Sequence, residues 1–228
     1  MTMLGLFIVL LIVAVKLKSV FQTLKITPIL MGVVFYSAVF AQTNPSKTQA
    51  SASSAVYAEK FKNVCAACHG LNGANDNQDV PRLAGQHSFY AITQLFLFRE
   101  GRRNNPAMVA LAKQMSDDDM RGFSDYIGTL VHVPVNSAAT PINAEKMLAG
   151  QKLANEHRCS FCHGNDMAGG KQVPRIGGQK EDYLLRSLRD LKSGVRPPYT
   201  RAMTETLSQV PEDDYETLAY YISRIDSK

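Results

Sequence analysis

The sequence predicts an all-α protein made of two similar domains in tandem. Residues 80–101 match residues 173–194 at a constant offset of 93, and residues 108–127 match residues 203–222 at an offset of 95. A repeat of this length corresponds to one small domain per copy. Apolar residues recur at helical spacing in both copies, and no segment shows the alternation expected of a β-strand.

The first 41 residues have the pattern of a targeting segment. Residues 26–40 form an apolar stretch that follows lysines and precedes Ala41 and a polar segment, which is the order of a secretory signal. A second apolar run at residues 3–15 is short for a bilayer span. We hypothesise that translation starts after this run, from about residue 17; a genuine membrane anchor is the alternative.

The net charge of +5 lies largely in the targeting segment. Three of the 25 basic residues and none of the 20 acidic residues lie in residues 1–41, so the remainder of the chain carries +2. A nucleic-acid-binding protein carries a cluster of basic residues on one face. This sequence has no such cluster, and it therefore predicts no nucleic-acid partner.

The repeat sets the expected domain boundaries. The first domain is predicted to span residues 50–131 and the second residues 144–228. The linker between them, residues 132–143, is rich in Pro, Ser, Ala and Asn. In each domain we expect a helix leading into the cysteine motif, a middle helix at about 87–100 or 180–193, and a last helix near the end.

The last helix of each domain has an identifiable start. Ser116 precedes Asp119 by three residues, as in a capping box. Pro211 occupies the corresponding part of the second domain and is expected at the first helical position. Both helices carry apolar residues at i, i+3 and i+7, which predicts that one face of each packs on a core.

All four cysteines occur in the motifs CAACHG, residues 65–70, and CSFCHG, residues 159–164. Disulfide bonds persist in exported proteins, but they do not explain the histidine after each pair. A four-cysteine zinc site would combine two pairs that lie about 90 residues apart. C-x-x-C-H is the attachment sequence of c-type haem, in which each thiol forms a thioether and the histidine ligates the iron. The motifs favour two haem groups, attached at Cys65, Cys68, Cys159 and Cys162 and ligated by His69 and His163.

The second axial ligand is expected at an equivalent place in both copies. Met108 and Met203 meet this condition, each about 40 residues after its histidine and just before the last helix. Met115 and Met120 align with residues of other types, and Met167 has no counterpart. Buried methionines often only fill a core. However, His–Met ligation is a cytochrome pattern, and we predict Met108 and Met203 as ligands.

Three further pairs recur at the offset of 93: Pro81 and Pro174, Arg82 and Arg175, and Tyr90 and Tyr183. We expect the proline carbonyls to accept a hydrogen bond from the ligand histidines, the arginines to pair with haem propionates, and the tyrosines to contribute a hydroxyl donor. Gly70 and Gly164 are expected to leave room beside the macrocycle. His87, His132 and His157 are not duplicated and are interpreted as surface or linker histidines.

Four paired elements occur in the same order in both copies: CxxCHG, VPRLAGQ with VPRIGGQ, FREGRR with LKSGVR, and a methionine followed by an Asp-Asp pair. Over about residues 50–228 this set resembles the cytochrome c4 family. The resemblance implies two class I cytochrome c domains related by a pseudo-twofold axis, with the propionate edges of two covalently bound haem c groups facing each other. It also implies a bacterial periplasmic electron carrier, loosely associated with the membrane. Its partners would be a quinol-oxidising cytochrome bc complex and a terminal oxidase or another reductase.

The sequence therefore favours an electron-transfer protein over an enzyme, because a histidine and a methionine on each iron leave no vacant position for a substrate. One alternative is a dihaem peroxidase-like enzyme, which needs one open or displaceable ligand position. Another is the cytochrome subunit of a complex with a flavoprotein dehydrogenase. The segment RRNNPAM is two residues shorter than VRPPYTRAM, so we expect the two methionine loops to differ.

Overall fold

The computed structural model describes residues 45–134, 142–197 and 201–226. These residues belong to one compact unit of the chain, Asn44–Lys228, whereas the predicted targeting segment lies outside the described residues. Part of the predicted linker, residues 135–141, also lies outside them.

The secondary structure of the described residues is helical, apart from one isolated bridge between Gly170 and Val173. This confirms the all-α prediction. None of the helices in the described ranges is both long enough and apolar enough to cross a membrane.

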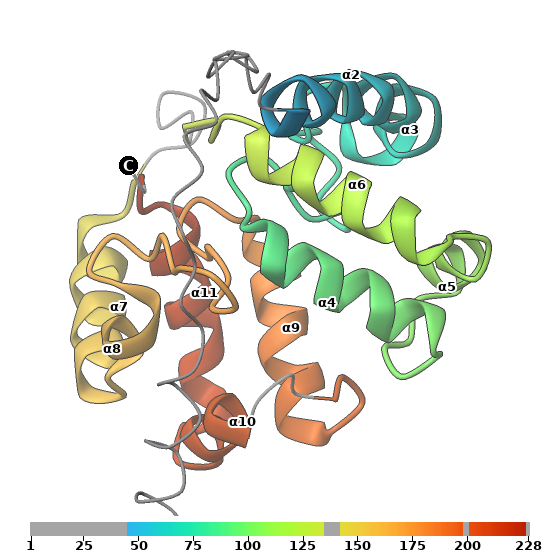
Figure 1. Cartoon of the computed structure of the whole chain (residues 1–228). Coiled ribbons are helices and arrows are strands. Elements are labelled where there is room, and N and C mark those ends of the chain that lie inside the picture. The colour runs from blue at the N-terminus through green and yellow to red at the C-terminus, as the bar shows by residue number, and fades with distance from the viewer. Residues whose placement is uncertain (1–44, 135–141, 198–200, 227–228) are drawn as a thin grey trace, which may run out of the picture. The chain divides into compact units, whose positions relative to one another are not determined.

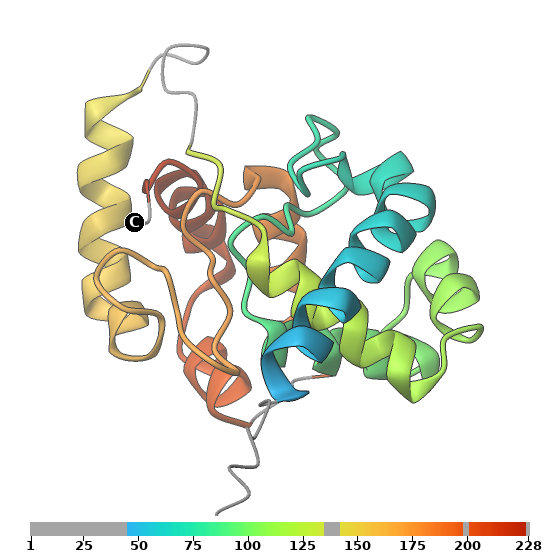
Figure 2. The ribbon, with the colours of Figure 1, turned by 45° about the horizontal axis from the view of Figure 1, so that its top comes forward.

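The helices of the first repeat are, in chain order, α2 (Pro45–Val64), α3 (Ala66–His69), α4 (Ser88–Arg99), α5 (Pro106–Ala112) and α6 (Asp117–Thr129). Those of the second repeat are α7 (Ala144–Glu156), α8 (Cys159–His163), α9 (Glu181–Ser193), α10 (Arg201–Ser208), the 3₁₀ turn η1 (Glu212–Asp214) and α11 (Tyr215–Ser223). The blue-to-green elements of the first repeat and the yellow-to-red elements of the second form separate groups in Figures 1 and 2.

Each repeat has its own apolar core, built where its first and last helices pack together. In the first repeat α2 packs on α6, and Phe61 is fully buried in a cluster that includes Phe123 and Ile127. In the second repeat α7 packs on α11, and Tyr215 is fully buried in a cluster that includes Leu218. The apolar faces predicted for the last helices are therefore the faces that pack on the cores.

In each repeat a glycine permits the first and last helices to cross closely. The glycine lies on the last helix of the first repeat and on the first helix of the second repeat. In the first repeat the glycine is Gly122 of α6, where an added Cβ would lie 2.0 Å from the Tyr57 ring of α2. In the second repeat it is Gly150 of α7, where an added Cβ would lie 2.3 Å from Tyr221 Cβ and 2.8 Å from the Thr217 carbonyl oxygen of α11.

The two last helices also begin differently. The Ser116 side chain accepts from Asp119 N and the Asp119 side chain accepts from Ser116 N, which is the predicted capping box of α6. The prediction for Pro211 is wrong in detail, because Pro211 precedes the 3₁₀ turn η1 and α11 starts only at Tyr215. Neither η1 nor α11 has a side-chain cap, and a 3₁₀ turn is a common way to begin a helix.

Candidate haem sites

A cavity of about 570 Å³ is lined by residues of both repeats. Its largely apolar wall includes the histidine and methionine that the sequence pairs in each repeat: His69 with Met108, and His163 with Met203. Cys65, Cys159 and Cys162 also line it. The predicted iron ligands of both repeats and three of the four predicted attachment cysteines thus line one continuous space.

Both motif histidines are buried and are held in the same orientation. His69 Nδ1 lies 3.1 Å from the Pro81 carbonyl oxygen, and His163 Nδ1 lies 3.0 Å from that of Pro174. Because a carbonyl only accepts, Nδ1 carries the proton and Nε2 keeps the lone pair that a metal needs. Burial lowers the pKa of both imidazoles, which favours this neutral form.

The glycine after each histidine has a conformational role. Gly70 has φ of +83° and Gly164 has φ of +79°, a region that residues with a Cβ rarely adopt. These angles turn the chain from the short motif helix into the loop that leads to Pro81 or Pro174. The turn by itself accounts for a glycine at both positions, and the expectation that they leave room beside the macrocycle stays a prediction.

No disulfide joins the four cysteines, all of which lie in the described residues, and Cys68 and Cys162 are exposed. Burial raises the pKa of the Cys65 thiol to about 12 and also raises that of Cys159. No group of three or more His, Cys, Asp or Glu in the described ranges is arranged to hold a metal ion. The donor set thus suits attachment of a ring by pairs of thiols better than a zinc site.

The predicted methionine ligands occupy equivalent short helices, each at the third residue. In α5, Pro106 is the first residue and the Asn105 side chain accepts from Met108 N at 3.0 Å. In α10, Met203 follows Arg201 and Ala202. Met108 and Met203 are both half-buried and pack against the core of their own repeat.

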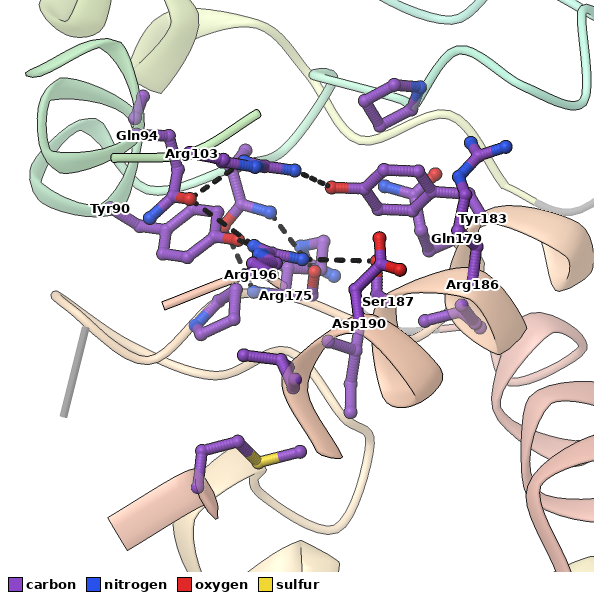
Figure 3. A pocket seen from close by; sticks show the side chains of 18 of the residues that line it. Tyr90, Gln94, Arg103, Arg175, Gln179, Tyr183, Arg186, Ser187, Asp190 and Arg196 are labelled. Carbon is purple, nitrogen blue, oxygen red and sulfur yellow. Dashed lines mark hydrogen bonds between the residues drawn. The ribbon is translucent and has the colours of Figure 1, made fainter. Parts of the chain in front are cut away.

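Two arginines that the sequence analysis did not select reach across between the repeats (Figure 3). Arg103 of the first repeat donates to the Tyr183 hydroxyl of the second at 2.8 Å, and Arg196 of the second donates to the Tyr90 hydroxyl of the first at 2.6 Å. Gln94 accepts from both guanidiniums, at 2.7 Å from Arg103 and 3.3 Å from Arg196. The signal was present, because Arg103 and Arg196 are related by the same offset of 93 as the two tyrosines.

These two cations lie in the cavity wall with neutral hydrogen-bond partners. Burial raises the pKa of Tyr183, but the guanidiniums of Arg103 and Arg196 outweigh it and lower that pKa, which indicates that this cluster favours a negative charge. Cations drawn away from water are stabilised by an anion within hydrogen-bond reach, and guanidiniums match carboxylates well. The propionates of a haem would supply such anions. The apolar wall, the two oriented imidazoles and this cationic cluster therefore fit haem.

The predicted propionate partners Arg82 and Arg175 are held by a reciprocal pair of glutamines. Gln179 accepts from Arg82 N at 2.9 Å and donates to Arg82 O at 3.0 Å. Gln86 accepts from Arg175 N and donates to Arg175 O, both at 3.1 Å. Arg175 Nε donates to the Gly85 carbonyl at 3.0 Å, whereas Arg82 Nε is buried with no hydrogen-bond partner in the described part of the chain. The propionate role of both arginines remains a prediction.

The histidines interpreted as surface or linker residues are half-buried instead. His87 bonds across to the Ala168 carbonyl of the second repeat through Nε2 at 2.8 Å. His132 Nε2 lies 3.4 Å from Asp226, and His157 Nε2 lies 3.5 Å from Asp214. Their partial burial arises from contacts between segments that are distant in the sequence, and none of the three lines the cavity with the predicted iron ligands.

Family models match both repeats. The model described as cytochrome c matches residues 58–130, and the one described as cytochrome c oxidase, cbb3-type, subunit III matches residues 145–222. Cytochrome c4 of Stutzerimonas stutzeri is 30% identical over 177 residues, which cover 70% of this chain and 83% of that protein. The chain belongs to the cytochrome c4 family.

Two more comparisons agree with this assignment. The crystal structure of reduced recombinant cytochrome c4 from Pseudomonas stutzeri has the same fold, with a TM-score of 0.67 at 24% identity over 75% of this chain and 98% of that one. A protein named thiosulfate dehydrogenase electron acceptor from Stutzerimonas stutzeri is 30% identical over 72% of this chain and 80% of its own length.

Membership of the cytochrome c4 family confirms the tandem class I cytochrome c architecture and two covalently bound haem c groups. The protein is a dihaem electron-transfer cytochrome and not an enzyme, and its partners are redox proteins.

Proposed function

We propose that the protein is a periplasmic carrier that takes electrons from a quinol-oxidising cytochrome bc complex and delivers them to a terminal oxidase or another reductase. The observation that supports this most is the single cavity wall that contains His69 and Met108 together with His163 and Met203. Each haem iron, when bound, exchanges one electron between its ferric and ferrous states. A histidine and a methionine at each iron leave no position for a substrate, and the methionine thioether favours the reduced state.

Electrons would enter and leave through the exposed edges of the two motifs. Cys68 and Cys162 are exposed, and each has an exposed apolar neighbour: Leu71 in the first repeat and Phe161, 88% exposed, in the second. The chain after residue 41 carries +2, which ionised propionates and ferric porphyrins would bring near zero. We therefore expect docking through these apolar patches, with little steering by net charge. A steep ionic-strength dependence of the reduction rate would contradict this.

A redox titration of the holoprotein tests the proposal. We expect an intact mass with two haems, two reversible one-electron steps in the visible spectrum, and no binding of carbon monoxide by the reduced protein at neutral pH. Rapid carbon monoxide binding at one haem would instead support the dihaem peroxidase-like alternative.

A second candidate is an electron acceptor dedicated to one dehydrogenase. The relative named thiosulfate dehydrogenase electron acceptor favours this candidate. The electron donor would then be a dehydrogenase other than the flavoprotein considered from the sequence alone. The two candidates differ in their fastest donor. Stopped-flow reduction of the same preparation by a purified bc complex and by a thiosulfate dehydrogenase with its substrate distinguishes them.

The proposed location requires export. The supporting pattern is the lysine-flanked apolar stretch before Ala41. Mass spectrometry of the mature protein should find an N-terminus near residue 42. An N-terminus before residue 30 would instead support retention of the segment, as a membrane anchor would require.

A further inference from the structure

Position 87 of the first repeat and position 180 of the second are equivalent, and each side chain reaches the other repeat. Lys180 is only 6% exposed, and its Nζ donates to Asn75 Oδ1 at 2.6 Å and to the Asn77 carbonyl. His87 contacts the matching loop of the second repeat through the Ala168 carbonyl. The two repeats therefore exchange contacts, but one contributes an ammonium and the other an imidazole.

The loop that Lys180 holds is joined directly to the first haem motif. Asn75 N donates to the His69 carbonyl at 3.1 Å, and the Asn75 side chain donates to the Cys68 carbonyl. In the second repeat Gly169 N donates to the His163 carbonyl at 2.7 Å, but Gly169 has no side chain to extend the contact. A Cβ at Gly169 would lie 2.4 Å from the Val173 carbonyl oxygen, so that position excludes an asparagine.

The two acceptors of Lys180 are neutral oxygens, so they hold the ammonium group in place but do not neutralise its positive charge. Burial and the neighbouring positive charge of Arg82 lower the pKa of Lys180 to about 8, so Lys180 is still largely protonated at pH 7. Asn75 accepts from Lys180 and donates to the carbonyls of Cys68 and His69, so this charge is held beside the first haem motif. A cation supplied by the second repeat thus acts on the first site.

We propose that Lys180 is a positioning residue for charge, which places a fixed cation of the second repeat beside the first haem motif and raises the reduction potential of the first iron. This inference rests on the proposed electron-carrier function. Reduction adds one electron from the donor protein to the site, and a nearby fixed positive charge stabilises the state with the additional electron. The potential of the first haem therefore depends on the presence of the second repeat.

The test is a redox titration of the Lys180→Met holoprotein, with the haem NMR signals assigned to each repeat. We expect the equilibrium constant for reduction of the first haem to fall about threefold, which is about 28 mV at 59 mV per decade. The second haem should keep its potential. Lys180→Arg, which retains the charge, should restore most of the first potential. Equal shifts of both haems, or no shift of the first, would overturn the proposal.

Two further variants distinguish the effect of the Lys180 charge from the effect of its hydrogen bond to the loop at Asn75. Asn75→Ala removes the link to Cys68 and leaves the charge of Lys180, so its effect on the first potential should be smaller than that of Lys180→Met. An equal effect would show that loop position and not charge sets the potential. His87→Lys places a cation at the equivalent point of the first repeat and should raise the potential of the second haem. A second potential unchanged or lowered by it would count against the proposal.

Failure of this inference can be told from failure of the proposed function. If both haems titrate reversibly without binding carbon monoxide, while Lys180→Met leaves the first potential unchanged, only the inference is wrong. If the reduced wild-type protein binds carbon monoxide rapidly, the proposed carrier function is wrong.

Discussion

The first repeat achieves its close helix crossing with Gly122 on its last helix, and the second with Gly150 on its first helix. In contrast, His69 and His163 are oriented by the same hydrogen bond to an equivalent proline carbonyl. A helix crossing needs one small residue, which either partner can provide. Orienting an imidazole requires a carbonyl at one place, which only a particular chain path provides. The repeats are therefore alike where chemistry sets the geometry and different where packing has alternatives.

The largest expected effect comes from removing one predicted methionine ligand. Met108→Ala should lower the potential of the first haem by on the order of 10² mV, because axial ligands set haem potentials over about 0.8 V. It should also allow carbon monoxide to bind at that repeat. Met203→Ala is the matched variant and should do the same in the second repeat. Redox titration and carbon monoxide difference spectra measure both effects, and a variant that changes neither would exclude its methionine as a ligand.

The glycines test whether the two crossings are equally tight. Gly150→Ala should lower the free energy of unfolding by about 3 kcal/mol, because the new Cβ meets a backbone carbonyl and a Cβ that cannot rotate away. Gly122→Ala should cost about 1 kcal/mol, because its nearest neighbour is the half-buried Tyr57 ring, which can turn. Chemical denaturation of the two holoproteins measures the difference. Equal losses would show that the Tyr57 ring is as fixed as the backbone.

The glutamines test the symmetry of the contacts between the repeats. Gln86→Leu removes both hydrogen bonds to the Arg175 backbone, and Gln179→Leu removes both to the Arg82 backbone. Each should destabilise the protein by about 1–3 kcal/mol, because a backbone donor and acceptor lose their partners. Denaturation followed by haem absorbance should give similar losses for the two. If only one variant lowered the free energy of unfolding, then only one of the two glutamines would contribute to the contact between the repeats.

The smallest expected effect concerns the cap of α6, which α11 lacks. Lys60 and the Ser116 hydroxyl lower the pKa of Asp119 to about 2, so its carboxylate stabilises the fold above its ordinary pKa near 3.8. This contribution is lost as the pH falls towards 2. Because Asp119 is partly exposed, Asp119→Asn should cost less than about 1 kcal/mol at pH 7. Urea denaturation at pH 7 and pH 2 should show the difference between variant and wild type disappear, and a difference that persists at pH 2 would argue against the ionic origin.

The features predictable from the sequence are those carried by short spacings or by duplication. The capping box of α6 and the apolar faces of the last helices follow from residues three to seven positions apart. The choice of Met108 and Met203 followed from equivalence between copies, and the structure places both in the cavity wall with the histidines. The same test applied to Arg103 and Arg196 would have selected them too. Pro211 misled because a proline is equally compatible with a 3₁₀ turn and an α-helix start.

The sequence by itself determined the haem chemistry and the helical class, because thioether attachment, helix periodicity and caps act over a few neighbouring residues. Only the tertiary structure decided which side chains contact the other repeat. Lys180 and His87 look like ordinary surface positions at the start of a helix, yet each reaches the loop of the other repeat. Such contacts depend on how two packed surfaces meet, and that arrangement is the sum of many apolar contacts that no local spacing records.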